Sequence, residues 1–108
     1  MAIAKRKQAT SIAVVTERVH EAAAVLKAMA SEHRLMILCR LGGGELTVSD
    51  LLAGTTLSQS ALSQHLAVLR EEGLVATRRE GQSIIYRIAD PAAVRVIETL
   101  ADIFCPEE

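Results

Sequence analysis

A short capped helix, a tight turn and a second capped helix constrain the fold of this sequence more than any other feature. The first helix is predicted over Glu45–Ala53, where Thr47 and Asp50 fit the capping-box pattern, in which each side chain binds the other residue's backbone N–H. The second helix begins after Ser58, a favoured N-cap residue, and ends before Gly73, which suits the left-handed position after a helix. Two helices joined in this way form a helix-turn-helix.

Strand-like and helical segments surround this pair. Residues 74–77 and 83–88 are rich in Val, Ile, Thr and Tyr, and the turn Arg79–Gln82 contains a glycine, which predicts a β-hairpin. Apolar residues spaced by three and four positions predict three further helices, over residues 11–29, 31–41 and 90–104. We therefore expect a mainly α fold with a β-hairpin wing, a winged helix-turn-helix, over residues 11–108. A flexible basic arm is expected at residues 1–10.

Composition limits the classes of protein to which the chain can belong. Of the 108 residues, 50% are hydrophobic, which is too apolar for a disordered tail, yet no apolar run is long enough to span a membrane. Only 2% are aromatic, which argues against a protein that stacks single-stranded bases. Two cysteines, and first residues unlike a secretory signal, predict a cytoplasmic protein. So much apolar surface in a small chain favours a homodimer.

The second helix of the pair carries the residues expected to read DNA. This helix lays its N-terminal half in the major groove, where Gln can bind adenine and Ser can bind a base edge or a phosphate. A net charge of −1 gives no global attraction to DNA, so local arginines must supply the charge that binds phosphates. Those of the helix and the hairpin are Arg70, Arg78, Arg79 and Arg87. The residues expected at the DNA are Ser58, Gln59, Ser60, Ser63, Gln64, His65, Arg70, Arg79 and Gln82.

Several of these positions also have a structural interpretation. Ser58 can act as a plain helix cap, and the polar positions that follow it can form a solvated helix face. His65 lies beside the apolar stripe of its helix, so it fits packing inside the protein as well as contact with DNA. The order of helix, turn, helix and hairpin favours the DNA-binding interpretation for the polar face.

Four stretches of the chain carry a resemblance to a known family. They are Met29–Leu38, Glu45–Leu51, Leu57–Arg70 and Gly73–Val75. Leu57–Arg70 is the most specific of them. Together they resemble the ArsR/SmtB family of winged-helix, dimeric transcriptional regulators. The resemblance implies a repressor that binds double-stranded operator DNA as a homodimer. We expect its first and last helices to form most of the dimer interface, through the Ile12–Met29 and Val94–Phe104 faces.

The metal-sensing motif of that family is absent. Where metal-sensing members carry two cysteines in the short helix, this sequence has Thr47 and Ser49, whose hydroxyls are poor ligands for soft ions. The last helix contains no His, and the three histidines, His20, His33 and His65, lie on three different predicted helices. We therefore expect neither a metal ion nor a cofactor, and no regulation by Zn²⁺, Cd²⁺ or arsenite. Catalytic residues are not expected either, because no Gly-rich phosphate loop or nucleophile pattern is present.

Cys39 and Cys105 are the remaining reactive residues. Their chemistry alone leaves two alternatives open, because a cysteine is often a small buried hydrophobe and a pair of thiols can also react with oxidants or sulfur donors. The resemblance implies that the two thiols react, since a cysteine pair without the metal motif is similar to that of the persulfide-sensing branch of SqrR, BigR and HlyU-like regulators. There the inducer is a persulfide or polysulfide, and a disulfide or polysulfide joins the thiols. The alternative is a constitutive or generally redox-responsive regulator whose cysteines do not sense sulfur.

Overall fold

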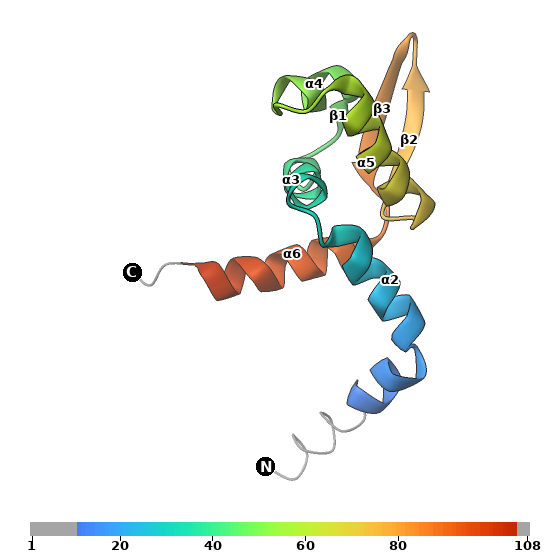
Figure 1. Cartoon of the computed structure of the whole chain (residues 1–108), viewed down its shortest axis with the longest axis vertical. Helices are drawn as coiled ribbons and strands as arrows, with labels where there is room; N and C mark the ends of the chain where they lie inside the picture. Colours follow the sequence, from blue (N-terminus) through green and yellow to red (C-terminus); the bar gives the residue numbers. More distant parts are fainter. Residues whose placement is uncertain (1–10, 106–108) are drawn as a thin grey trace.

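The computed structural model describes residues 11–105, in which a bundle of helices carries a small sheet at one end (Figure 1). Helical backbone covers residues 11–17 and is followed by a turn at Arg18. The elements that follow are α2 (Val19–Met29), α3 (Glu32–Leu41), β1 (Leu46–Thr47), α4 (Val48–Ala53), α5 (Gln59–Glu71), β2 (Val75–Glu80), β3 (Ser83–Ile88) and α6 (Pro91–Phe104). This order is the predicted winged helix-turn-helix. The basic arm predicted for residues 1–10 lies outside the described residues.

Local capping sets most of the helix boundaries, as the sequence predicts. Thr47 and Asp50 form a complete capping box at α4, with both hydrogen bonds at 3.0 Å. The Ser58 hydroxyl accepts a hydrogen bond from the Ala61 N–H at 3.1 Å and so begins α5. Gly73 follows α5 with a φ of +73°, a conformation that glycine adopts without strain.

Two expectations about the helices are wrong. The first predicted helix is interrupted at Arg18, where the N–H is shared between the carbonyls of Val14 and Val15. The Thr16 hydroxyl donates to the Ile12 carbonyl at 2.9 Å, a contact that tends to bend helices. The short helix begins later than predicted, because its first residues form strand β1 instead of a helical turn.

Strand β1 joins the hairpin in a three-stranded antiparallel sheet of order β1-β3-β2. Leu46 of β1 lies opposite Tyr86 of β3, and Thr77 of β2 lies opposite the same tyrosine on its other side. The hairpin is longer than predicted, because β2 continues to Glu80, which lies opposite Ser83. Its turn is therefore two residues, beginning with Gly81 at a φ of +62°.

The core lies where α3, α4, α5 and the start of the hairpin meet. Its largest fully buried side chains are all leucines, namely Leu38, Leu51, Leu62, Leu66, Leu69 and Leu74. Three of them come from α5, so burial of one face fixes the rotation of this helix and leaves the opposite face outward. The core thus determines which α5 side chains are presented to solvent.

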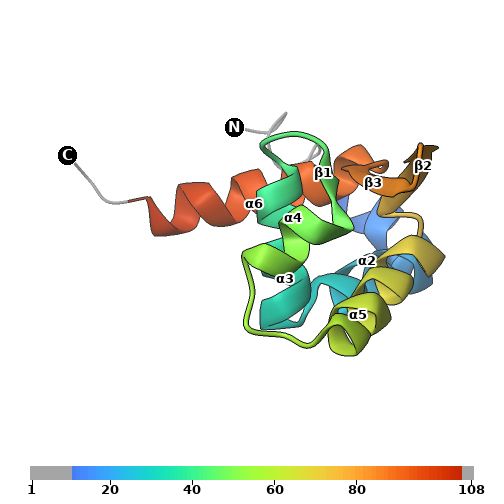
Figure 2. The ribbon, with the colours of Figure 1, turned by 90° about the horizontal axis from the view of Figure 1, so that it is seen from above.

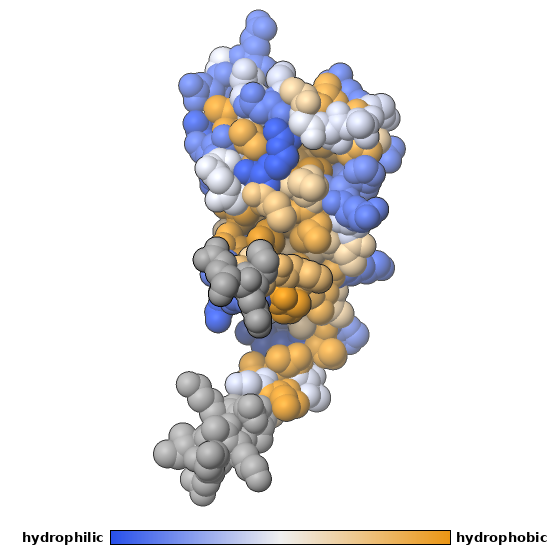
Figure 3. Space-filling model, turned by 90° about the vertical axis from the view of Figure 1, so that its left-hand side faces the viewer, coloured by the Kyte–Doolittle hydropathy of each residue, from blue (hydrophilic) through white to orange (hydrophobic). Residues whose placement is uncertain are grey.

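Two helical arms extend away from this core. The segment of residues 11–29 and helix α6 diverge from the body in Figure 1, and from above α6 runs past α3 and projects beyond it (Figure 2). Hydrophobic side chains gather over these arms, whereas hydrophilic ones dominate the surface near α4 (Figure 3). Seven large apolar side chains of the arms are exposed: Ile12, Val14, Val15, Val19, Leu26, Ile103 and Phe104. None of the helices described between residues 11 and 105 is long and apolar enough to cross a membrane.

Candidate nucleic-acid interface and cysteine pair

The outward face of α5 presents short polar side chains from its first two turns. Gln59, Ser60, Ser63 and Gln64 are all exposed, while the buried leucines of α5 anchor the opposite face. Ser58 is also exposed, although its hydroxyl is already engaged in capping the helix. The structure therefore brings five of the nine expected residues to one continuous surface, which we call the α5 polar face.

A shallow hollow links the α5 polar face to the tip of the hairpin. It lies between the start of α4, the start of α5 and the hairpin turn. Its lining residues are Thr47, Val48, Ser49, Gln59, Gln82, Ser83 and Ile84. Gln59 and Gln82 are distant in sequence but line this same hollow, because β1 and β3 pair beside α4. Both amides can therefore face one ligand.

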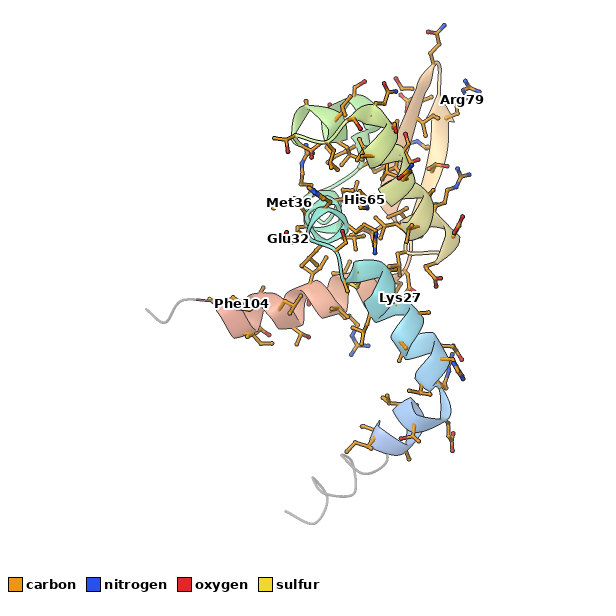
Figure 4. The ribbon with its side chains drawn as sticks, in the orientation of Figure 1. Lys27, Glu32, Met36, His65, Arg79 and Phe104 are labelled. Atoms are coloured by element: carbon orange, nitrogen blue, oxygen red, sulfur yellow. The ribbon has the colours of Figure 1, made fainter. Side chains whose placement is uncertain are left out.

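The arginines expected to bind phosphates are not equivalent. Arg70 is exposed in the last turn of α5 and lines a surface hollow together with Ser63 and Tyr86. Arg79 is exposed on β2 and points away from the protein near the far end of the hairpin (Figure 4). Both guanidinium groups are accessible to a phosphate.

Arg78 is different because it is already paired with carboxylates. Its guanidinium forms ion pairs with Glu45 and, at 3.1 Å, with Glu80. The hydrogen bond that Arg78 donates to Glu45, followed by the one it donates to Glu80, raises the pKa of Arg78 above its ordinary value. In the free chain Arg78 thus ties β2 to the residue before β1, and its guanidinium is already engaged by carboxylates, unlike those of Arg70 and Arg79.

His65 faces the protein and not the α5 polar face. It lies half-buried between α5 and α3 (Figure 4), with its ring centroid 5.5 Å from that of His33. The Arg34 guanidinium lies 3.2 Å from His65 Nδ1, and since arginine can only donate, this nitrogen is the acceptor. Burial, then the nearby charges of Arg34 and His33, lowers the pKa of His65. These contacts favour the structural interpretation that the sequence left open.

The two cysteines are both exposed to solvent. Cys39 lies on α3, and Cys105 is the C-cap residue of α6. Helices α3 and α6 pack against one another, so the two thiols belong to neighbouring elements. The alternative in which each cysteine is a small buried hydrophobe does not hold for this chain, since both side chains lie outside the core.

The positions that could ligate a metal are dispersed or occupied by other contacts. Within residues 11–105, no three side chains of His, Cys, Asp and Glu gather closely enough to hold a metal ion. Thr47 uses its hydroxyl in the α4 capping box. The hydrogen bonds from the Thr47 backbone N–H and side chain lower the pKa of Asp50, which keeps this carboxylate in its capping role.

Two arginines of α3 that sequence reasoning did not single out make most of the polar contacts between helices. Arg34 Nε donates to the Ala28 carbonyl at 2.5 Å and so joins α3 to the end of α2. Arg40 donates to two carbonyls of α4. No local pattern marks these residues, because their partners are six to eleven positions away in sequence.

Known proteins resemble this chain in sequence and in structure. Residues 31–77 match the family described as "Bacterial regulatory protein, arsR family". The biofilm growth-associated repressor of Agrobacterium fabrum is 50% identical over 93 residues, which cover 85% of this chain and 80% of that protein. The solved structure of reduced HlyU from Vibrio cholerae is 46% identical with a TM-score of 0.78, over 85% of this chain and 97% of that one.

A third match is a DNA-binding domain of the same fold. It is the homodimeric winged helix-turn-helix DNA-binding domain of Mb0332 from Mycobacterium bovis, which was described as a possible ArsR-family transcriptional regulator. It is 32% identical with a TM-score of 0.72, over 87% of this chain and 90% of that one. From the repressor match over most of both chains, together with the matching fold, we conclude that this chain belongs to the ArsR family of bacterial regulatory proteins.

Proposed function

We propose that this transcriptional regulator binds operator DNA as a homodimer and releases it when Cys39 and Cys105 react with a persulfide. Members of the ArsR family are regulators of transcription and not enzymes, so the chain acts by binding. The observation that carries the sulfur part of the proposal is the pair of exposed cysteines on two helices in contact.

The α5 polar face supports the DNA part of the proposal. Its exposed amides and hydroxyls are the side chains that read base edges, and Gln64 is the most C-terminal of them. Arg70 and Arg79 add accessible positive charge on either side. In a two-fold dimer, two copies of α5 enter successive major grooves on one side of the duplex, about 34–36 Å apart, so the operator is an inverted repeat.

Two substitutions separate base reading from phosphate binding. The probe is the duplex that the wild-type protein selects from a random-sequence pool, which we call the selected duplex. Its affinity is compared with that of a scrambled duplex. Gln64→Ala is expected to reduce the preference for the selected duplex by about 1–3 kcal/mol, because it removes a bidentate base contact. Arg79→Ala is expected to weaken both duplexes alike and to lower the slope of log Kd against log salt, because it removes a phosphate contact. Fluorescence anisotropy at several salt concentrations measures both quantities.

The matched control for these substitutions is Arg78→Ala. Because Arg78 is paired with Glu45 and Glu80, its loss should leave the salt dependence close to that of the wild type. The proposal that α5 reads the base sequence is contradicted if the wild-type protein binds both duplexes equally. It is also contradicted if Gln64→Ala keeps the wild-type preference for the selected duplex.

The exposed apolar arms support the homodimer. In the single chain, seven large hydrophobic side chains are exposed to solvent, on residues 11–26 and at the end of α6. So many exposed large apolar side chains on two helical segments are typical of a protein–protein interface. The Mycobacterium bovis domain with this fold is homodimeric, and pairing through the same arms would cover them here.

The proposed sulfur chemistry needs only the two thiols and a persulfide RSSH. The Cys39 thiolate attacks the outer sulfur of RSSH, the S–S bond breaks, and the thiol RSH leaves, so that Cys39 becomes a persulfide. The Cys105 thiolate then attacks Sγ of Cys39 and expels hydrosulfide, which gives a disulfide. If Cys105 also becomes a persulfide, condensation of the two persulfides gives a bridge with one more sulfur and again releases hydrogen sulfide.

The proposed order is that Cys39 attacks first and Cys105 resolves the persulfide. Cys105 is the C-cap residue of α6, and Cys39 lies in the last turn of α3. Both thiols are exposed, and the intact masses of the two single-cysteine variants decide the order.

To test this proposal, the complex of the protein and the selected duplex is treated with glutathione persulfide. We expect at least about a tenfold loss of affinity, which corresponds to about 1.4 kcal/mol. Intact mass should show the loss of two hydrogens for a disulfide, with one added sulfur for each longer bridge. Glutathione disulfide serves as the control for ordinary oxidation. A bridged protein that keeps its affinity shows instead a constitutive regulator whose cysteines do not sense sulfur.

A further inference from the structure

The side chain of Arg40 connects α3 to the first helix of the helix-turn-helix. From its position near the end of α3, the guanidinium donates to the Leu51 carbonyl at 2.9 Å and to the Asp50 carbonyl at 2.8 Å. Arg40 is half-buried, and both of its contacts reach the same turn of α4. One side chain therefore spans the gap between two helices that are joined in sequence by a glycine-rich turn.

The carbonyls that Arg40 contacts lie in the last turn of α4, where a positive charge stabilises a helix most. The last carbonyls of a helix lack the N–H that would follow four residues later, and they form the negative end of its dipole. In α4, which is only six residues long, a large part of the helix consists of such groups. The Gly54 N–H reaches the carbonyls of Leu51 and Leu52, and Arg40 supplies two further, charge-assisted hydrogen bonds.

Gly54 provides the space for this contact. A Cβ atom on Gly54 would lie 2.4 Å from Arg40 Cζ and from Nη1, and 2.7 Å from Nη2. Gly54 has a φ of −92°, which any residue can adopt, so backbone conformation does not explain a glycine here. Its missing side chain is what lets the guanidinium lie against the end of α4. By contrast, a Cβ on Gly43 would meet only the Arg40 carbonyl, at 3.5 Å.

We infer that Arg40 is a positioning residue for DNA binding, and that Gly54, by lacking a side chain, leaves the space that the Arg40 guanidinium occupies. Residues 54–58 connect α4 directly to α5, so holding the end of α4 fixes where α5 begins and how its polar face is presented. Arg40 itself points at protein carbonyls and not at the α5 polar face. The inference rests on the proposed role of α5 in reading DNA.

The expected loss of DNA affinity depends on the fraction of protein molecules in which α4 is held in its binding position. If loss of the two hydrogen bonds reduces that fraction to about one-tenth, the apparent affinity for the selected duplex falls about tenfold. Arg40→Met keeps the aliphatic stem and removes the donors, so it should show this loss. Arg40→Lys retains one charged donor and should recover part of the affinity. In both variants the slope of log Kd against log salt should match the wild type, because no phosphate contact is removed.

Gly54→Ala tests the same contact from the other side. Its methyl group should displace the guanidinium and reproduce the effect of Arg40→Met, whereas Gly43→Ala, the matched control, should bind within about twofold of the wild type. The double variant Arg40→Met with Gly54→Ala should bind no more weakly than Arg40→Met alone, because the clash no longer exists. This non-additivity is a readout that a general loss of stability does not produce. Thermal unfolding of each variant is measured alongside.

Several results would overturn the inference. One is that Arg40→Met and Gly54→Ala both bind the selected duplex within twofold of the wild type. Another is that the losses of affinity add in the double variant. A third is a lower slope of log Kd against log salt in Arg40→Met, which would make Arg40 a phosphate contact. If Arg40→Met does not fold, Arg40→Lys and Gly54→Ala decide the question. A wild-type protein with no preference for the selected duplex would instead remove the proposed function, and this inference with it.

Discussion

Phe104→Glu is expected to separate the proposed homodimer into monomers at micromolar concentration and to abolish tight binding of the selected duplex. Phe104 is 79% exposed in the single chain, at the far end of α6 (Figure 4). Burying a side chain of this size contributes about 1.5–3 kcal/mol, and a two-fold interface contains it twice. Its replacement by a charge should therefore weaken association by at least about a hundredfold.

Sedimentation velocity over a range of micromolar concentrations measures the dimer directly, and anisotropy measures DNA binding on the same samples. A monomer can contact only one half-site, so it loses the gain that comes from linking two recognition helices. We expect its affinity to become nearly independent of the second half of the inverted repeat. Loss of the dimer and loss of half-site coupling should appear together.

Met36→Glu is the matched control for this substitution. Met36 is 60% exposed, but it lies on α3 and lines a hollow beside the α4–α5 turn, away from the arms. The same change of charge and loss of apolar surface should leave the protein dimeric. If Phe104→Glu stays dimeric at the lowest concentrations, or if Met36→Glu dissociates as readily, the arms are not the interface.

The elements that sequence patterns could predict are those fixed by neighbours in the chain. The caps at Ser58 and at Thr47 with Asp50 act over three residues, and Gly73 ends α5 through its own backbone conformation. Periodic leucines then place one face of α5 in the core. For these reasons the helix-turn-helix and the α5 polar face follow from the sequence.

The features that could not be predicted depend on partners far away in the chain. Strand β1 is two residues long and exists only because Leu46 and Thr47 pair with β3, nearly forty positions later. Likewise, Arg78 is paired with Glu45, which the fold brings beside it. Inspection of either residue and its neighbours in sequence gives no sign of these contacts.

The orientation of His65 has the same kind of cause. Its place beside the apolar stripe was visible in the sequence, but the ring is held by Arg34 and His33, which arrive from α3. The Arg40 contact with Gly54 likewise joins residues separated by a turn, a strand and a helix. For His65, contacts with residues distant in sequence, and not local propensity, therefore decide whether the side chain is available to a ligand.

Cys39→Ser and Cys105→Ser are each expected to bind the selected duplex like the wild type and to remain bound when glutathione persulfide is added. A hydroxyl can neither accept a sulfur atom from a persulfide nor attack a persulfide to form a bridge. Both cysteines lie outside the core, so exchange of sulfur for oxygen should not disturb the fold. The response of the wild type, at least about tenfold in affinity, should therefore disappear in both variants.

Intact mass of the two variants then distinguishes the roles of the thiols. Cys105→Ser should accumulate a persulfide on Cys39, because the first step proceeds and the resolving thiol is missing. Cys39→Ser should gain sulfur more slowly, because the proposed first nucleophile is missing. The wild-type bridge should appear at the mass of one chain under denaturing, non-reducing conditions, since it forms within a protomer.

The contrary results each point to a different mechanism. If both single variants still release the duplex on treatment, the cysteines do not sense the donor. If one variant responds and the other does not, modification of a single thiol is sufficient, and the bridge is not the signal. A wild-type product at twice the chain mass would place the bond between protomers. Its effect on affinity would then come from locking the dimer interface, and not from tying α6 to α3 within a single chain.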